Sequence, residues 1–174
     1  MQNELKGKIL WCFKQKKGIK LVKPNENLCN AYLKKSNNAL KSMYLNMESK
    51  IYEWAVEAAY YARYYAVYAL LQKLGIKSEI HDCSIISIKY LFQNKISLEL
   101  IEELEKAKEQ RINLVYYTNK NIPEKEIKDN INAVPSFLLE IEKLISELRT
   151  EEINDLRKNL NKILNINSQN KFNN

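Results

Sequence analysis

The 174-residue sequence has few residues that turn the chain, with only three glycines and three prolines. A protein of many β-strands needs more turns than these residues supply, which excludes a sandwich or barrel. No apolar run reaches the roughly 18 residues of a membrane-spanning helix, and no apolar core of a signal peptide follows the N-terminus. We therefore expect a helical, cytoplasmic protein with no membrane association.

Cysteine and histidine are also scarce. The three cysteines, Cys12, Cys29 and Cys83, are odd in number and far apart, which predicts reduced thiols and neither a disulfide framework nor a zinc site. The one histidine, His81, cannot form a multi-histidine metal site, so we expect no metal and no other cofactor. Its place beside Asp82 near a helix start favours a structural or capping role over that of a general base.

The positive charge is concentrated at the N-terminus. The whole chain carries a net charge of +7, and residues 1–23 hold seven lysines against one glutamate, a net charge of +6. We therefore expect a basic N-terminal extension over residues 1–24, which either contacts RNA phosphates or is simply solvated. The candidate RNA contacts are Lys14, Lys16, Lys17 and Lys20.

Apolar residues at helical spacing predict an all-α fold, an antiparallel bundle of four to five long helices with a short C-terminal helix. Residues 25–148 should form the bundle, and residues 149–174 a short amphipathic helix with a frayed tail. The helix-end signals are Asn25 or Asn27, Ser78 and Ser97 as N-caps, Pro123 in a first turn and Gly75 as a C-terminal stop.

The segment 51–74 is expected to be the central helix, because its alanines permit close approach by neighbouring helices. Its predicted inner face consists of Ile51, Trp54, Ala55, Ala58, Ala62, Tyr65, Ala66 and Ala69. A second, aromatic face consists of Tyr52, Tyr60, Tyr61, Tyr64 and Tyr68. Tyrosines at helical spacing pack in a core or interface more often than they stack on bases, although both remain open.

Arg111 stands out because it occupies an apolar position, in line with Leu104, Ala107 and Leu114. A guanidinium is costly to bury unpaired, so Arg111 should face a carboxylate, a cleft or a subunit seam. An internal ion pair and a phosphate-binding role are both consistent with this position. Arg63 is a weaker candidate, with a solvated or stacking arginine as the alternative.

Several segments, in the same order, resemble the HEPN family (higher eukaryotes and prokaryotes nucleotide-binding). Residues 54–75 run through small and aromatic residues to Ala-Leu-Leu and a glycine, which resembles the second-helix signature of that family. Residues 77–81 are similar to its Lys-Thr-His stretch, and residues 107–116 to its Ala-x-x-x-Arg segment. The start of the fifth helix at residues 122–126 also fits. The resemblance implies a helical bundle that works as a homodimer with nucleotides or RNA.

In the nuclease members of this family, an Arg-x4–6-His motif from each subunit meets at a dimer seam and cuts RNA without metal. Arg111 matches the arginine, but Tyr116, Tyr117 and Thr118 occupy the window of the histidine. The chain is therefore more similar to the branch found beside minimal nucleotidyltransferases. In toxin–antitoxin pairs of that kind the transferase can add AMP to a tyrosine near the motif, and Tyr116 and Tyr117 are candidates.

The resemblance implies a non-catalytic or weakly catalytic member of such a pair, with Arg111, Arg63 and Tyr64 binding nucleotide or RNA at a dimer cleft. One alternative is a divergent metal-independent ribonuclease toxin that uses Arg111 with Tyr116 or His81. Another is a helical protein-interaction module without nucleotide chemistry.

Overall fold

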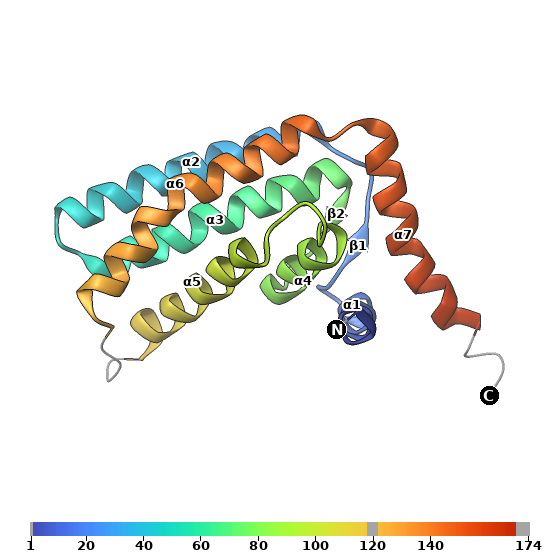
Figure 1. The fold of residues 1–174 in the computed structure, drawn as a ribbon, viewed down its shortest axis with the longest axis horizontal. Coiled ribbons are helices and arrows are strands. Elements are labelled where there is room, and N and C mark those ends of the chain that lie inside the picture. Colours follow the sequence, from blue (N-terminus) through green and yellow to red (C-terminus); the bar gives the residue numbers. More distant parts are fainter. Residues whose placement is uncertain (1, 118–121, 170–174) are drawn as a thin grey trace.

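The computed structural model describes residues 2–117 and 122–169, with the side chains of residues 3–117 and 122–163. The predicted all-α fold is confirmed (Figure 1). The helices of the described residues are α1 (Gln2–Lys14), α2 (Glu26–Glu48), α3 (Tyr52–Leu74), α4 (His81–Leu91), α5 (Leu98–Tyr116), α6 (Glu124–Glu147) and α7 (Thr150–Gln169). None of them is long and apolar enough to cross a membrane.

Helix α3 is the centre of the bundle, as predicted, and contacts α2, α4, α5, α6 and α7 (Figure 1). The alanines of its inner face are buried, and α2 packs closely along it. Trp54 and Ile51 were wrongly placed on that face, since they are 59% and 46% exposed. Trp54 instead lines an open pocket between α2 and α3.

The helix-end signals are largely confirmed. The Asn25 side chain accepts a hydrogen bond from the Leu28 amide at 2.9 Å, and Ser97 accepts one from Leu100 at 3.2 Å. Gly75 ends α3 with a left-handed φ of 68°, which suits glycine. The prediction for Ser78 is wrong, because its hydroxyl binds the backbone of Ile80 before α4 begins.

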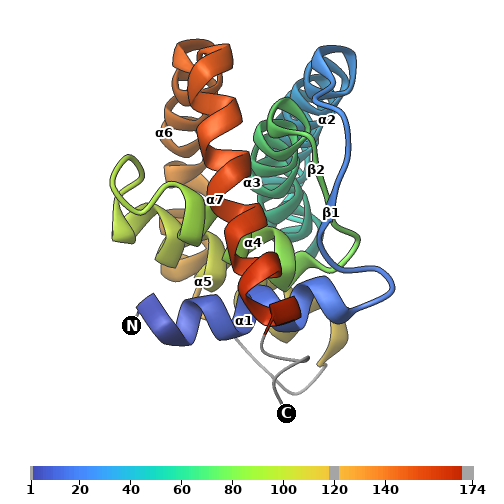
Figure 2. The ribbon, with the colours of Figure 1, turned by 90° about the vertical axis from the view of Figure 1, so that its right-hand side faces the viewer.

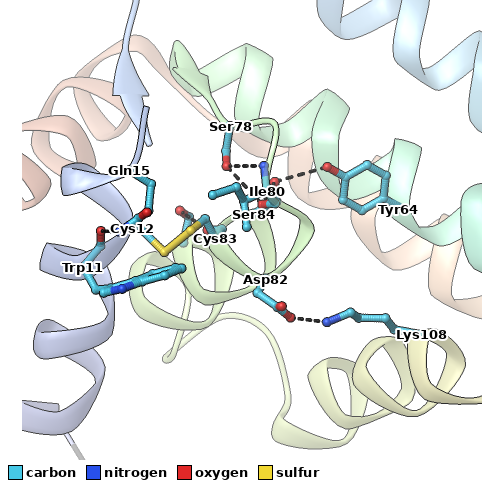
Figure 3. Close-up of a disulfide and its surroundings, with 11 residues drawn as sticks. Trp11, Cys12, Gln15, Tyr64, Ser78, Ile80, Asp82, Cys83, Ser84 and Lys108 are labelled. Carbon is cyan, nitrogen blue, oxygen red and sulfur yellow. Dashed lines mark hydrogen bonds and ion pairs between the residues drawn. A yellow bond between two sulfur atoms is a disulfide. The ribbon is translucent and has the colours of Figure 1, made fainter. Parts of the chain in front are cut away.

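The N-terminal segment is folded onto the bundle. Helix α1 packs against α4, and the short strand β1 (Lys20–Leu21) pairs antiparallel with β2 (Ile76–Lys77), a small ladder that the sequence pattern did not predict. Cys12 of α1 and Cys83 of α4 form a disulfide, with Trp11 drawn beside it (Figure 3). The prediction of reduced thiols is therefore wrong for this pair, because helix packing brings their Cα atoms to 5.6 Å across 71 residues of chain. Cys29 is free and buried.

The C-terminal helices follow the predicted apolar stripes. The stripe of α6 is buried from Ile127 to Ile145, and Pro135 lies within that helix. Helix α7 is longer than predicted and lies across one end of the bundle, in contact with α1 and α3 (Figure 2). Arg157 fastens it there, because its Nη1 donates to the carbonyls of Leu74, Gly75 and Val22 at 2.6–2.9 Å. Of the tail predicted to fray, residues 170–174 lie outside the described part of the chain.

Candidate functional site

Arg111 projects from α5 towards α3, where a carboxylate receives it. Its Nε donates to Oε2 of Glu57 at 2.8 Å, and the two side chains are only 11% and 17% exposed. Of the three surroundings predicted for Arg111, the carboxylate is therefore the one observed. Burial alone lowers the pKa of Arg111, but the hydrogen bond and charge of Glu57 outweigh it and leave the pKa above its ordinary value.

Three tyrosine rings surround the same guanidinium. Its central carbon lies 5.3 Å, 5.2 Å and 5.5 Å from the ring centroids of Tyr60, Tyr61 and Tyr116. Its Nη2 also donates to the Tyr116 hydroxyl at 3.1 Å. Contacts of a cation with ring faces favour the charged form and fix the plane of the guanidinium. Because Tyr116 is 64% exposed, the site opens to solvent on that side.

His81, at the start of α4, joins this group through Tyr60. The Tyr60 hydroxyl lies 2.7 Å from His81 Nδ1, and the imidazole stacks on Tyr64 with centroids 3.9 Å apart. Burial, followed by the charges of Arg111 and Lys108, lowers the pKa of His81, which favours the neutral ring.

Both partners of this hydrogen bond favour their neutral forms. Burial raises the pKa of Tyr60 far above its ordinary value, so the phenol keeps its proton. A neutral phenol both donates and accepts, so the tautomer of His81 decides whether the hydroxyl or Nδ1 is the donor. We call Arg111, Glu57, Tyr60, Tyr61, Tyr116 and His81 the Arg111 cluster.

Two further contacts tie α4 to its neighbours beside this cluster. Lys108 of α5 pairs with Asp82 of α4 (Figure 3). Tyr64 is buried, and its hydroxyl lies 3.3 Å from the Ser84 hydroxyl, so its polar atom points into the protein. Burial raises the pKa of Tyr64 to about 12. Tyr64 was predicted to bind nucleotide or RNA; in the structure its ring supports His81 and its hydroxyl is engaged inside the fold.

Arg63 is not brought together with Arg111. It is 1% exposed, donates from Nη2 to the carbonyl of Asn130 in α6 at 2.7 Å, and lies over the ring of Phe137. Its Nε has no hydrogen-bond partner within the described residues. Burial lowers the pKa of Arg63 to about 10, against the charge of Glu103. It belongs to the interior between α3 and α6.

The remaining predicted residues lie at the surface. Tyr117 is 50% exposed at the end of α5, and Thr118 lies outside the described residues. Among the candidate RNA contacts, Lys17 pairs with Glu79 at 3.7 Å, while Lys14, Lys16 and Lys20 are exposed. No group of histidine, cysteine, aspartate or glutamate side chains suited to a metal ion occurs in the described part of the chain.

Sequence reasoning missed Glu57 and gave His81 only as an alternative partner of Arg111. The window of the family motif lies on the helix of Arg111, whereas His81 comes from α4 and meets the cluster at Tyr60 and Tyr61. The segment that ends at His81 had resembled a family motif, and that was the available signal. Nothing in the spacing of Glu57 distinguished it from other surface glutamates.

The chain also matches a known protein family. Residues 29–144, more than half of the chain, match the family model of the HEPN domain. The matched range includes the whole of α3, α4 and α5, and therefore every member of the Arg111 cluster. No curated protein sequence matches the chain.

Proposed function

Because the chain belongs to the HEPN domain family, we propose that it binds nucleotides or single-stranded RNA at the Arg111 cluster. The observation that supports this most is a charged guanidinium held over three tyrosine rings at a site that opens to solvent beside Tyr116. A guanidinium binds phosphate through parallel N–H donors, and exposed rings stack on unpaired bases. The proposed site therefore combines the two groups that a nucleotide requires.

We further propose that the protein is non-catalytic or weakly catalytic. A metal-free ribonuclease needs a base that accepts the proton of the attacking hydroxyl. Nδ1 of His81 is occupied by the Tyr60 hydroxyl at 2.7 Å, and burial with the charges of Arg111 and Lys108 lowers its pKa. His81 is therefore a weak base. The nearness of His81 to Arg111 nonetheless favours a divergent ribonuclease toxin as the second candidate function.

The likeness to the branch beside minimal nucleotidyltransferases extends the proposal to a partner. In a toxin–antitoxin pair of that kind, working as a cytoplasmic homodimer, the Tyr116 or Tyr117 hydroxyl would attack the α-phosphorus of ATP. The phenol proton and pyrophosphate would leave, and AMP would remain on the tyrosine. Both tyrosines are at least half exposed, so a transferase could reach them. On Tyr116 the new phosphate would lie beside Arg111.

The test is incubation of the full chain with labelled single-stranded RNA, followed by native and denaturing gels. The proposal expects a shifted band on the native gel and intact RNA on the denaturing gel. Cleavage that disappears in His81→Gln would establish the ribonuclease reading instead. Absence of both binding and cleavage would leave the protein-interaction module.

Two companion measurements test the partners. Light scattering should give twice the chain mass of 20.5 kDa for the homodimer. Intact mass after co-expression with a neighbouring nucleotidyltransferase gene should show the addition of one AMP, and this addition should be lost in the double variant Tyr116→Phe/Tyr117→Phe. A monomer, or an unchanged mass, would contradict the corresponding part of the proposal.

A further inference from the structure

A pocket of about 350 Å³ opens between α2 and α3, beside the Arg111 cluster. The residues that line it include Asn46 of α2 and Trp54, Glu57, Tyr61 and Tyr65 of α3. Glu57 and Tyr61 also contact Arg111, so the pocket and the cluster share a wall. The volume falls within the usual range of small-molecule sites.

Three aromatic side chains line the pocket. The rings of Tyr61 and Tyr65 stack on each other, with centroids 5.4 Å apart and planes inclined by 30°. Trp54 is 59% exposed, although tryptophan usually buries most of its large surface. Such rings stack on any nucleobase, because every base presents an aromatic face.

Two of the residues that line the pocket, Asn46 and Glu57, offer acceptor atoms to a ligand. The Asn46 side-chain nitrogen donates to the backbone and hydroxyl oxygens of Ser42 at 2.8 Å and 3.3 Å, so its oxygen is the atom that can receive a ligand. The Glu57 carboxylate receives Arg111 at Oε2 and has capacity for further donors. The exocyclic amino groups of bases and the hydroxyls of ribose are such donors, and carboxylates bind ribose in dinucleotide sites.

The charges distinguish a nucleotide from the other ligand that aromatic rings attract, an organic cation. A cation cage needs a carboxylate whose charge is not already neutralised. Among the described lining residues only Glu57 is a carboxylate, and it is paired with Arg111 at 2.8 Å. The guanidinium beyond that wall repels a cation and attracts a phosphate.

We propose that this pocket is the nucleoside subsite of the Arg111 cluster. A nucleoside monophosphate unit, free or within single-stranded RNA, stacks its base on Trp54, Tyr61 and Tyr65. Its ribose donates to Glu57, and its phosphate binds Arg111. This inference rests on the function proposed above, because both use the guanidinium of Arg111 as the phosphate ligand.

The fluorescence of Trp54 reports on the proposed stacking directly. The chain has two tryptophans, so Trp11→Phe leaves Trp54 as the only one. We expect AMP and adenosine to quench its emission, whereas inorganic phosphate should not. Single-stranded oligoadenylate should quench it as well. Tighter binding of oligoadenylate than of AMP would identify RNA as the source of the nucleotide, and the reverse would identify the free nucleotide.

Affinities of variants, measured by calorimetry with AMP, complete the test. Trp54→Ala should weaken AMP at least tenfold, and Trp54→Phe should recover most of the loss. Tyr44→Ala removes an aromatic side chain of α2 that is 46% exposed and does not line the pocket, so it should have no effect. The control also separates loss of the subsite from general effects of removing a surface ring.

Three results would overturn the inference. In the first, AMP binds the wild-type chain and its binding requires Arg111, but AMP does not quench Trp54 and binds Trp54→Ala as tightly as the wild type. The subsite would then be wrong, and the proposed function would stand. If tetramethylammonium quenches Trp54 and AMP does not, the pocket is a cation site. Failure of AMP, adenosine and oligoadenylate alike to bind would end both the inference and the proposed function.

Discussion

Replacing Arg111 with methionine keeps most of the side-chain stem and removes the charge that Glu57 faces. Breaking a buried ion pair costs about 3–5 kcal/mol of unfolding free energy, chiefly through the carboxylate left behind. The 11% and 17% exposures of Arg111 and Glu57 let some water reach that carboxylate. We therefore expect a smaller loss of about 2–3 kcal/mol, at and below the lower limit of that range.

Removing the other charge of the pair, by Glu57→Gln, should lower the unfolding free energy by less. Arg111 keeps its bond to the Tyr116 hydroxyl and its contacts with three rings, so about 1–2 kcal/mol should be lost. The double variant Arg111→Met/Glu57→Gln removes both charges. Its loss of unfolding free energy should be smaller than the sum of the two single losses, with a coupling energy of about 1–2 kcal/mol.

Urea unfolding of the four chains, followed by circular dichroism, measures this cycle. Arg149→Met is the matched control, because Arg149 is exposed and lies outside the cluster. Strictly additive losses, or an Arg111→Met chain as stable as the wild type, would show that the Arg111–Glu57 contact contributes nothing to the fold.

Three other changes give separate tests. Gly75→Ala should lower stability by about 1–3 kcal/mol in the same unfolding assay, because φ is 68° and the added Cβ would collide with α7 and with the backbone before α2. His81 has a pKa below its ordinary 6.5, so the unfolded chain takes up its proton first and stability should fall as the pH drops through the window below 6.5. In His81→Gln, pH-dependent melts should lose this contribution, and an unchanged pH profile would argue against it. Thiol titration of the oxidised, unfolded chain should find one free thiol, that of Cys29. Reduction of the Cys12–Cys83 bond, which links positions 71 residues apart, should lower the unfolding free energy by up to about 4 kcal/mol. Three reactive thiols before reduction would exclude the disulfide.

The helices were predictable because their evidence is local. The apolar stripe of α6 recurs every three or four residues, so the sequence alone gives both the helix and its buried face. The caps at Asn25 and Ser97 are also local, since each side chain binds an amide three residues later. Gly75 is also a local signal, because its own left-handed backbone conformation ends α3.

The composition of the site was only partly predictable, because periodicity identifies a face but not the helix that covers it. Arg111 was found because a charge interrupts an apolar stripe, but its partner Glu57 lies 54 residues away on α3. The Cys12–Cys83 bond likewise depends on α1 packing against α4. Trp54 was misplaced because an apolar side chain counts as buried in a helical pattern, even where two helices leave a pocket open.

The claim that this HEPN chain binds a nucleotide or RNA phosphate through Arg111 is tested most directly by titrating labelled single-stranded oligoadenylate with three folded proteins. These are the wild type, Arg111→Met and Arg149→Met, each checked for helicity by circular dichroism at the temperature of the titration. The account predicts that Arg149→Met binds like the wild type and Arg111→Met at least tenfold more weakly, as expected when a charged hydrogen bond to phosphate is lost. Equal affinity of Arg111→Met and the wild type would contradict it.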